Sequence, residues 1–172
     1  MIKKTFTTYF FLLLSIGLFA KDVDIQLIAK DSTPPILTFE QLKPYLTTKS
    51  DSVFVINFWA TWCAPCVAEM PYFEKLNVDF SPQKVKVILV NLDLKSQIAT
   101  KLLPFLEKNR LKSKVVVLSE KNANNWIPKV HPEWAGSIPA TLIFDKNKRV
   151  FFEQSFDRYA DLKKVISRFV GK

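Results

Sequence analysis

Continuous apolar runs along the chain predict buried strands. Residues 53–59 and 85–92 are almost wholly apolar and rich in β-branched side chains, which is typical of strands covered on both faces of a sheet. The polar run at residues 145–148 predicts a hairpin turn. Three shorter strands are predicted from the same pattern, at residues 115–118, 140–144 and 150–154. The last two strands flank the turn and should pair with each other.

Between these strands, apolar residues recur at the spacing of a helix. Thr38, followed three residues later by Gln41, has the pattern of a capping box and predicts a helix start. Ser96 is expected to cap the third helix, and Pro71 is expected to kink the second. The four predicted helices cover residues 39–46, 63–80, 97–110 and 159–170.

The order of these elements predicts an α/β fold. A mixed central sheet should carry helices on both faces and an antiparallel hairpin at its C-terminal edge. Residues 23–29 alternate loosely and are expected to form a first strand. Residues 122–134 are less regular, with tryptophans set among polar side chains.

Residues 1–20 have the composition of a secretory signal segment. Lys3 and Lys4 precede an apolar run at residues 9–19, and Ala20 is suited to the position before a cleavage site. We therefore expect export to a periplasmic or other extracytoplasmic compartment.

An uncleaved anchor is the alternative for this segment. Residues 5–20 would then tether the protein to a membrane. In either case residues 21–172 are expected to form a single domain, because their length suits one hydrophobic core.

The chain is basic, with a formal net charge of +9, and loss of residues 1–20 would leave +7. The lysines are scattered in pairs such as residues 163–164. Nucleic-acid binding would favour a basic stripe with interleaved aromatic residues, so no nucleic-acid partner is expected. A solvated basic surface explains the charge.

Cys63 and Cys66 are the only cysteines of the chain, and they lie where the predicted strand at residues 53–59 gives way to a helix. In this context a C-x-x-C motif is typical of redox chemistry. The pair encloses too short a loop to join distant parts of a fold. Ala64 and Pro65 carry no charge, which favours a reducing or intermediate couple over a strongly oxidising one.

The motif and its surroundings resemble a known family. Residues 59–66 read Trp-Ala-Thr-Trp-Cys-Ala-Pro-Cys, and Ile138 and Pro139 precede a strand far along the chain. These features resemble the thioredoxin-like fold. The predicted export, Glu69, and the added helix–strand segment at residues 97–118 resemble the TlpA-like family of extracytoplasmic bacterial thiol–disulfide oxidoreductases.

The resemblance implies a thioredoxin-like three-layer sandwich with four or five strands and a cis bond before Pro139. It implies no cofactor beyond the redox-active disulfide of Cys63 and Cys66. The implied partners are a disulfide-containing extracytoplasmic protein as substrate and a membrane-embedded electron-donor protein. Because residues 122–134 lie just before Pro139, we expect them to border the site.

The two cysteines should have different roles. Unpaired N–H groups and the dipole at a helix N-terminus stabilise a thiolate, so Cys63 is expected to attack the substrate. Cys66 lies one turn further in and should resolve the mixed disulfide. Glu69 lies on the same side of the helix, and Asn57 stands where thioredoxins have a buried Asp. The resemblance therefore implies that Glu69 accepts the proton of Cys66; a surface glutamate is the alternative.

Substrate contacts are expected from residues on both sides of the pair. A cis Pro139 facing Cys63 would leave the backbone of Ile138 available to an extended substrate segment. Trp59 is expected to lie in the core below the pair. The expected substrate-binding residues are Trp62, Ala64, Pro65, Ile138 and Pro139.

The leading interpretation is an exported protein-disulfide reductase. If the cysteine pair had a higher reduction potential, the same residues would form a net oxidase or isomerase. A non-enzymatic alternative is a copper or zinc carrier that uses Cys63, Cys66 and His131. These three ligands leave the fourth position of a tetrahedral site empty, so no metal site is expected and His131 is expected to face solvent.

Overall fold

Strand β2 (Val53–Trp59) is the centre of the sheet, and all seven of its residues are buried. It pairs in parallel with β3 (Val85–Asn91) and antiparallel with β5 (Ala140–Phe144). The computed structural model describes residues 33–171 of the chain. The described sheet has six strands in the order β1-β4-β3-β2-β5-β6. The three outer strands are β1 (Ile36–Leu37), β4 (Lys114–Leu118) and β6 (Arg149–Phe152).

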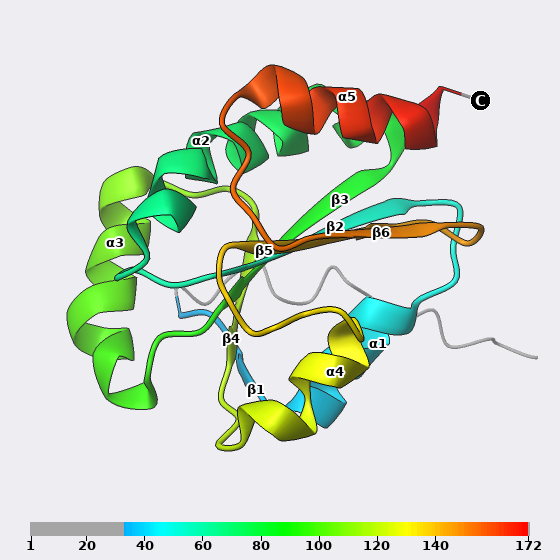
Figure 1. Ribbon diagram of the computed structural model, residues 1–172. Helices are drawn as coiled ribbons and strands as arrows, with labels where there is room; N and C mark the ends of the chain where they lie inside the picture. The colour runs from blue at the N-terminus through cyan, green and yellow to red at the C-terminus, as the bar shows by residue number, and fades with distance from the viewer. Residues whose placement is uncertain (1–32, 172) are drawn as a thin grey trace, which may run out of the picture. The chain divides into compact units, whose positions relative to one another are not determined.

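Helices cover both faces of this sheet, as Figure 1 shows. The face covered by α2 (Ala64–Asp79) and α5 (Tyr159–Val170) also carries α3 (Leu103–Asn109). The other face is covered by α1 (Phe39–Thr47) and α4 (Ile127–Val130). The result is the three-layer α/β arrangement expected from the sequence.

Alternation along β2 creates two separate hydrophobic cores. Val55 and Trp59 pack toward α2 and α5, whereas Phe54, Ile56 and Phe58 pack toward α1. Successive side chains of a strand point to opposite faces, so a strand in the middle layer must be apolar throughout. The exception in β2 is Asn57, which is buried on the α2 side of the sheet.

The capping box predicted at Thr38 is present. The Thr38 hydroxyl accepts the N–H of Gln41 at 3.4 Å, and Oε1 of Gln41 accepts the N–H of Thr38 at 2.9 Å. The helix continues past Pro44 to Thr47. Helix α2 likewise continues across Pro71, and the kink at this residue stays a prediction.

The single helix predicted at residues 97–110 is wrong in detail. A 3₁₀ turn (Lys95–Gln97) leads into a π-helical turn (Ile98–Leu102), and only then does α3 begin. The break coincides with Pro104, the second residue of α3, where a proline is tolerated because the N–H groups of the first turn have no partner within the helix. Ser96 is not the cap: the side chain of Gln97 accepts the N–H of Leu94 at 3.1 Å.

The sheet also departs from expectation at its edges. The six strands exceed the four or five implied by the resemblance, because the two residues of β1 pair in parallel with β4. The return strand ends at Phe152 rather than at residue 154. The predicted strand at residues 23–29 and the predicted signal segment lie outside the described residues.

Residues 122–134 contain two short helical pieces, a 3₁₀ turn (Ala123–Asn125) and α4. Trp126 and Trp134 pack on Phe58, with ring centroids 6.2 and 4.7 Å from it. This segment therefore closes the core under the α1 face of the sheet. No helix within residues 33–171 is long and apolar enough to cross a membrane.

The capping box should contribute measurably to stability. Thr38→Ala removes the acceptor for the Gln41 N–H, and we expect the free energy of unfolding to fall by about 1 kcal/mol. Urea denaturation should show a lower midpoint at unchanged slope. Thr47→Ala is the matched control, because within residues 33–171 the Thr47 hydroxyl donates to Lys43 O of the same helix and accepts no N–H from the helix start. Equal losses in the two variants would contradict the capping role.

Candidate active site

The turn between β2 and α2 places Cys63 beyond the carboxyl end of the central strand. The N–H of Cys63 bonds to Ala60 O at 3.1 Å and closes the turn. Asp93, which follows β3, is buried and accepts the N–H of Thr61 through Oδ1 at 2.9 Å. Asn91 donates its side-chain N–H to the other oxygen of Asp93 at 3.2 Å. The turn after β2 is therefore held by hydrogen bonds to the residues at the end of β3.

Cys63 and Cys66 are joined by a disulfide, with their Cα atoms 5.3 Å apart. Cys63 is the N-cap of α2, and its Sγ accepts the N–H of Cys66 at 3.4 Å. Cys66 has no exposed surface, whereas a small part of Cys63 reaches solvent. Pro65 fits the first turn because the N–H groups there have no partner within the helix. The sequence-based expectation of an outer Cys63 and an inner Cys66 is confirmed.

The segment before β5 forms the opposite wall. The bond between Ile138 and Pro139 is cis, as the resemblance implies. Because β5 is antiparallel to β2, its first residue, Ala140, lies opposite Phe58 near the end of β2. The carbonyl oxygen of Ile138 thereby lies 3.7 Å from Sγ of Cys63.

Glu69 is buried beneath the pair, with 1% of its surface exposed. Its Oε2 accepts the N–H of Phe156 at 2.8 Å, and its Oε1 accepts an N–H of Asn57 at 3.1 Å. Burial raises the pKa of Glu69 from its ordinary 4.5 to about 7, and these two hydrogen bonds oppose part of the rise. The expectation of a buried carboxyl group is confirmed, and the surface alternative is wrong. The role of Glu69 as proton acceptor stays a prediction.

Asn57 connects Glu69 to the sheet. Its Nδ2 also donates to the hydroxyl oxygen of Thr141 at 3.0 Å. Among the described residues, its Oδ1 is buried without a hydrogen-bond partner. The amide thus presents two donors to the carboxyl group and the hydroxyl group, and keeps an unused acceptor beside them.

The exposed rim of the site is apolar. Trp62 is 62% exposed beside the pair, and Ala64 and Pro65 are exposed at the start of α2. Trp59, by contrast, is fully buried, as predicted. Sequence reasoning missed Leu94, which is 67% exposed and follows Asp93, the residue bonded to the active-site turn.

Sequence reasoning also missed Asp93, Glu153 and the N–H of Phe156. Glu153 accepts the N–H groups of Ala135 and Ser137 at 2.9 and 2.8 Å, just before Ile138. These contacts go to main-chain groups, which leave no side-chain pattern in the sequence. The available signal was position alone: Asp93 directly follows the strand predicted at residues 85–92, and Glu153 lies near the end of the strand predicted at residues 150–154.

The alternative metal site is not assembled. Within residues 33–171, no group of three or more His, Cys, Asp or Glu side chains is placed to hold a metal ion. His131 is half-buried rather than fully solvent-facing: its ring stacks on Phe151 with centroids 4.6 Å apart. Its Nδ1 accepts the N–H of Glu133 at 3.4 Å.

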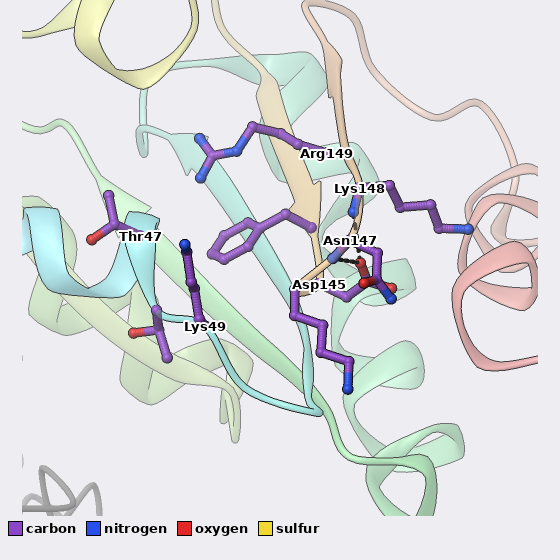
Figure 2. A pocket seen from close by; sticks show the side chains of 9 residues that line it. Thr47, Lys49, Asp145, Asn147, Lys148 and Arg149 are labelled. Carbon is purple, nitrogen blue, oxygen red and sulfur yellow. Dashed lines mark hydrogen bonds between the residues drawn. The ribbon is translucent and has the colours of Figure 1, made fainter.

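A basic hollow of about 250 Å³ lies near the start of β2, at the end of this strand away from the disulfide. It is lined by the end of α1 and by the β5–β6 turn. Figure 2 shows Lys148 pointing away from Arg149 in this region. The guanidinium of Arg149 donates to Leu46 O and, at 3.4 Å, to Val130 O. Lys146 pairs with Asp51 at 2.8 Å. Arg149 and Lys146 thus connect neighbouring elements of the fold, at the end of β2 away from the disulfide.

Comparison with known proteins agrees with this geometry. The family model described as AhpC/TSA matches residues 29–152. The chain belongs to the AhpC/TSA family. Within it, the chain is similar to the thiol-disulfide oxidoreductase ResA of Geobacillus kaustophilus, with 32% identity over 127 residues, which cover 72% of this chain and 67% of that protein. The resemblance to TlpA-like oxidoreductases is thereby confirmed.

Solved structures of other proteins share the fold. A thiol:disulfide interchange protein, DsbE, from Chlorobium tepidum has 25% identity and a TM-score of 0.54, over 70% of this chain and 82% of that one. A secreted thiol-disulfide isomerase from Corynebacterium glutamicum has 22% identity and a TM-score of 0.58, over 72% and 73%. With the Cys63–Cys66 pair, the similarity to ResA identifies the chemistry of the chain as thiol–disulfide exchange.

The raised pKa of Glu69 predicts a pH-dependent stability. The folded state holds the proton more tightly than the unfolded state, so the contribution is complete below about pH 4.5 and is lost as pH rises through about 7. Relative to Glu69→Gln, the oxidised wild type should lose about 3 kcal/mol between pH 4.5 and 8, measured by urea denaturation.

Glu133→Gln is the matched control, because it removes one exposed carboxyl group. Its stability should follow that of the wild type across this range. If the difference between wild type and Glu69→Gln did not change with pH, Glu69 would not titrate in this window.

Proposed function

We propose that this chain is an exported reductase of disulfides in extracytoplasmic proteins. The observation that carries the proposal is the position of Cys63, at the N-terminus of α2 and 3.7 Å from the carbonyl oxygen of Ile138. A nucleophilic sulfur lies there beside a stretch of main chain that an extended substrate can pair with. The uncharged Ala64 and Pro65 support the reducing direction.

In the reduced protein, Cys63 is the attacking group. The N–H of Cys66 points at its sulfur, and the positive end of the helix dipole stabilises the thiolate. The Cys63 thiolate attacks one sulfur of the substrate disulfide, forms a mixed disulfide and releases the other sulfur as a thiolate. The Cys66 thiolate then attacks Cys63, so the substrate leaves with two thiols and the Cys63–Cys66 disulfide forms.

The second attack requires Cys66 to lose its proton in a buried place. Glu69 lies one turn further along α2, and its pKa of about 7 lets it accept a proton near neutral pH. Asn57 suits both states of this carboxyl group. Its Nδ2 donates to the carboxylate, and rotation of the amide would offer the unused Oδ1 to the carboxylic acid.

The substrate wall consists of main chain and exposed side chains. Ile138 offers its backbone, and Pro139 sets the direction in which that backbone enters β5. Trp62, Ala64 and Pro65 are exposed on the other side of the pair. An extended segment that carries a disulfide would lie between these two surfaces.

The reaction has to be resupplied with electrons in an oxidising compartment. We propose an upstream dithiol protein, membrane-embedded, that reduces the Cys63–Cys66 disulfide. Residues 1–20 would direct the chain out of the cytoplasm or anchor it to the membrane. The same residues would run in the oxidising direction if the reduction potential exceeded that of the substrate, so the measured potential decides between reductase and oxidase.

A trapping experiment tests the proposed function. With Cys66→Ser, the mixed disulfide on Cys63 cannot be resolved, so substrate proteins should accumulate as adducts in the native host. Non-reducing gels and mass spectrometry would identify them. The matched control is Cys63→Ala combined with Cys66→Ser, which should carry none. Adducts that persist in the control, or none in either variant, would contradict the exchange mechanism.

The role of Glu69 is tested separately. Glu69→Gln keeps the shape and the acceptor for the Phe156 N–H but cannot take a proton from Cys66. We expect resolution at neutral pH to slow about tenfold or more, since general bases contribute 10²–10⁴-fold, while the first attack stays unchanged. Stopped-flow measurements of single turnovers separate the two steps. Resolution at the wild-type rate would remove Glu69 from the mechanism.

A further inference from the structure

A single carboxylate binds the loop that carries Ile138 to the active site. Oε2 of Glu153 accepts the N–H of Ala135 at 2.9 Å, and Oε1 accepts the N–H of Ser137 at 2.8 Å. Gly136 lies between these residues with φ of 102°. That left-handed conformation favours glycine and lets the loop wrap around the carboxylate.

The position of Glu153 follows from the strand register. Phe152 is the last residue of β6 and lies opposite Thr141 in β5. Glu153 is therefore next to the point where the chain enters β5 after Pro139. The other side of the loop is fixed by Trp134, whose indole N–H donates to Ser137 O at 2.8 Å. Both contacts end at Ser137, one residue before Ile138.

The segment that holds Glu153 also contacts the proton acceptor. Three residues further on, the N–H of Phe156 donates to Oε2 of Glu69. Phe156 is buried against Phe73 of α2, with ring centroids 6.3 Å apart. Residues 153–156 thus connect the loop before Pro139 with the helix that carries the cysteines.

We propose that Glu153 is a positioning residue for the exchange reaction. By binding two N–H groups at once, it fixes the main chain of Ile138 at the place where an extended substrate pairs with it beside Cys63. Hydrogen bonds to a carboxylate are roughly twice as strong as those between neutral groups, so the loop is held firmly. This inference rests on the proposed function and adds a residue that determines how peptide substrates are bound.

The test compares two small disulfides with the same leaving group. One probe is an extended synthetic peptide whose central cysteine is disulfide-bonded to thionitrobenzoate, and the other is 2-mercaptoethanol bonded to thionitrobenzoate. In each case the Cys63 thiolate attacks the sulfur of the cysteine or of mercaptoethanol, and thionitrobenzoate leaves as a coloured thiolate with the bonding electrons. Cys66 then displaces the probe from Cys63. Only the peptide has amide groups that can pair with the backbone of Ile138.

Glu153→Gln keeps one acceptor but turns an NH₂ group toward the other loop N–H. We expect the rate constant for the peptide to fall about tenfold, the size of effect that one lost charged hydrogen bond produces. The rate constant for the mercaptoethanol probe should change less than about twofold, because attack on it needs only the Cys63 thiolate at the helix N-terminus. Glu133→Gln, an exposed carboxyl group beside the same loop, should react with both probes at the wild-type rates.

Two results would overturn the inference: equal slowing with both probes, which indicates a general structural role, or unchanged rates with both. Hydrogen exchange provides an independent measurement, since the Ala135 and Ser137 amides should lose protection in Glu153→Gln and keep it in Glu133→Gln. Failure of the proposed function is recognised earlier, in the wild type. If the reduced protein releases thionitrobenzoate from neither probe faster than Cys63→Ala does, the exchange chemistry fails, and this inference fails with it.

Discussion

The antiparallel pairing of β2 with β5 is the constraint on which the site depends. Since Ala140 lies opposite Phe58, β5 starts at the end of the sheet where β2 finishes. The chain before β5 must therefore pass Cys63, although Ile138 is 75 residues further along the sequence. A parallel β5 would begin at the other end of β2, about 20 Å away for a strand of this length. The two walls of the site meet because this strand runs against its neighbour.

The same sheet holds a carboxyl group that the core would otherwise disfavour. Glu69 shares its face of α2 with Met70, Phe73 and Leu76, all of them buried. Each of its oxygens accepts one hydrogen bond, from Asn57 and from Phe156, so both oxygens of this buried carboxyl group have a partner. These bonds only partly offset the cost of burial, and the pKa remains near 7. Because part of the desolvation cost of the Glu69 carboxylate is not compensated, its proton affinity suits exchange with a thiol at neutral pH.

Sequence reasoning succeeded where one physical effect dominated. Strand β2 was predicted to the residue because every position is buried, and α5 because its apolar residues follow a regular helical period. It failed at Pro104, where apolar spacing says nothing of the π turn that precedes a proline. The cysteines follow from their motif, but the cis bond at Pro139 came only from the family resemblance. The contacts of Glu153 could not be predicted from the sequence, because they go to main-chain N–H groups, which every residue except proline has.

Three carboxylates fix the walls of the site through such groups: Asp93 on Thr61, Glu153 on Ala135 and Ser137, and Glu69 on Phe156. Loops have no strand ladder to bind their N–H groups, so an acidic side chain takes that place and leaves the loop in one conformation. The conformational entropy of these walls is then lost during folding rather than when substrate binds. Under the proposed function, a wall of fixed main chain recognises backbone, which all extended substrates have in common. One such site could therefore serve several disulfide-containing proteins, with the exposed Trp62 and Leu94 as the side chains able to discriminate among them.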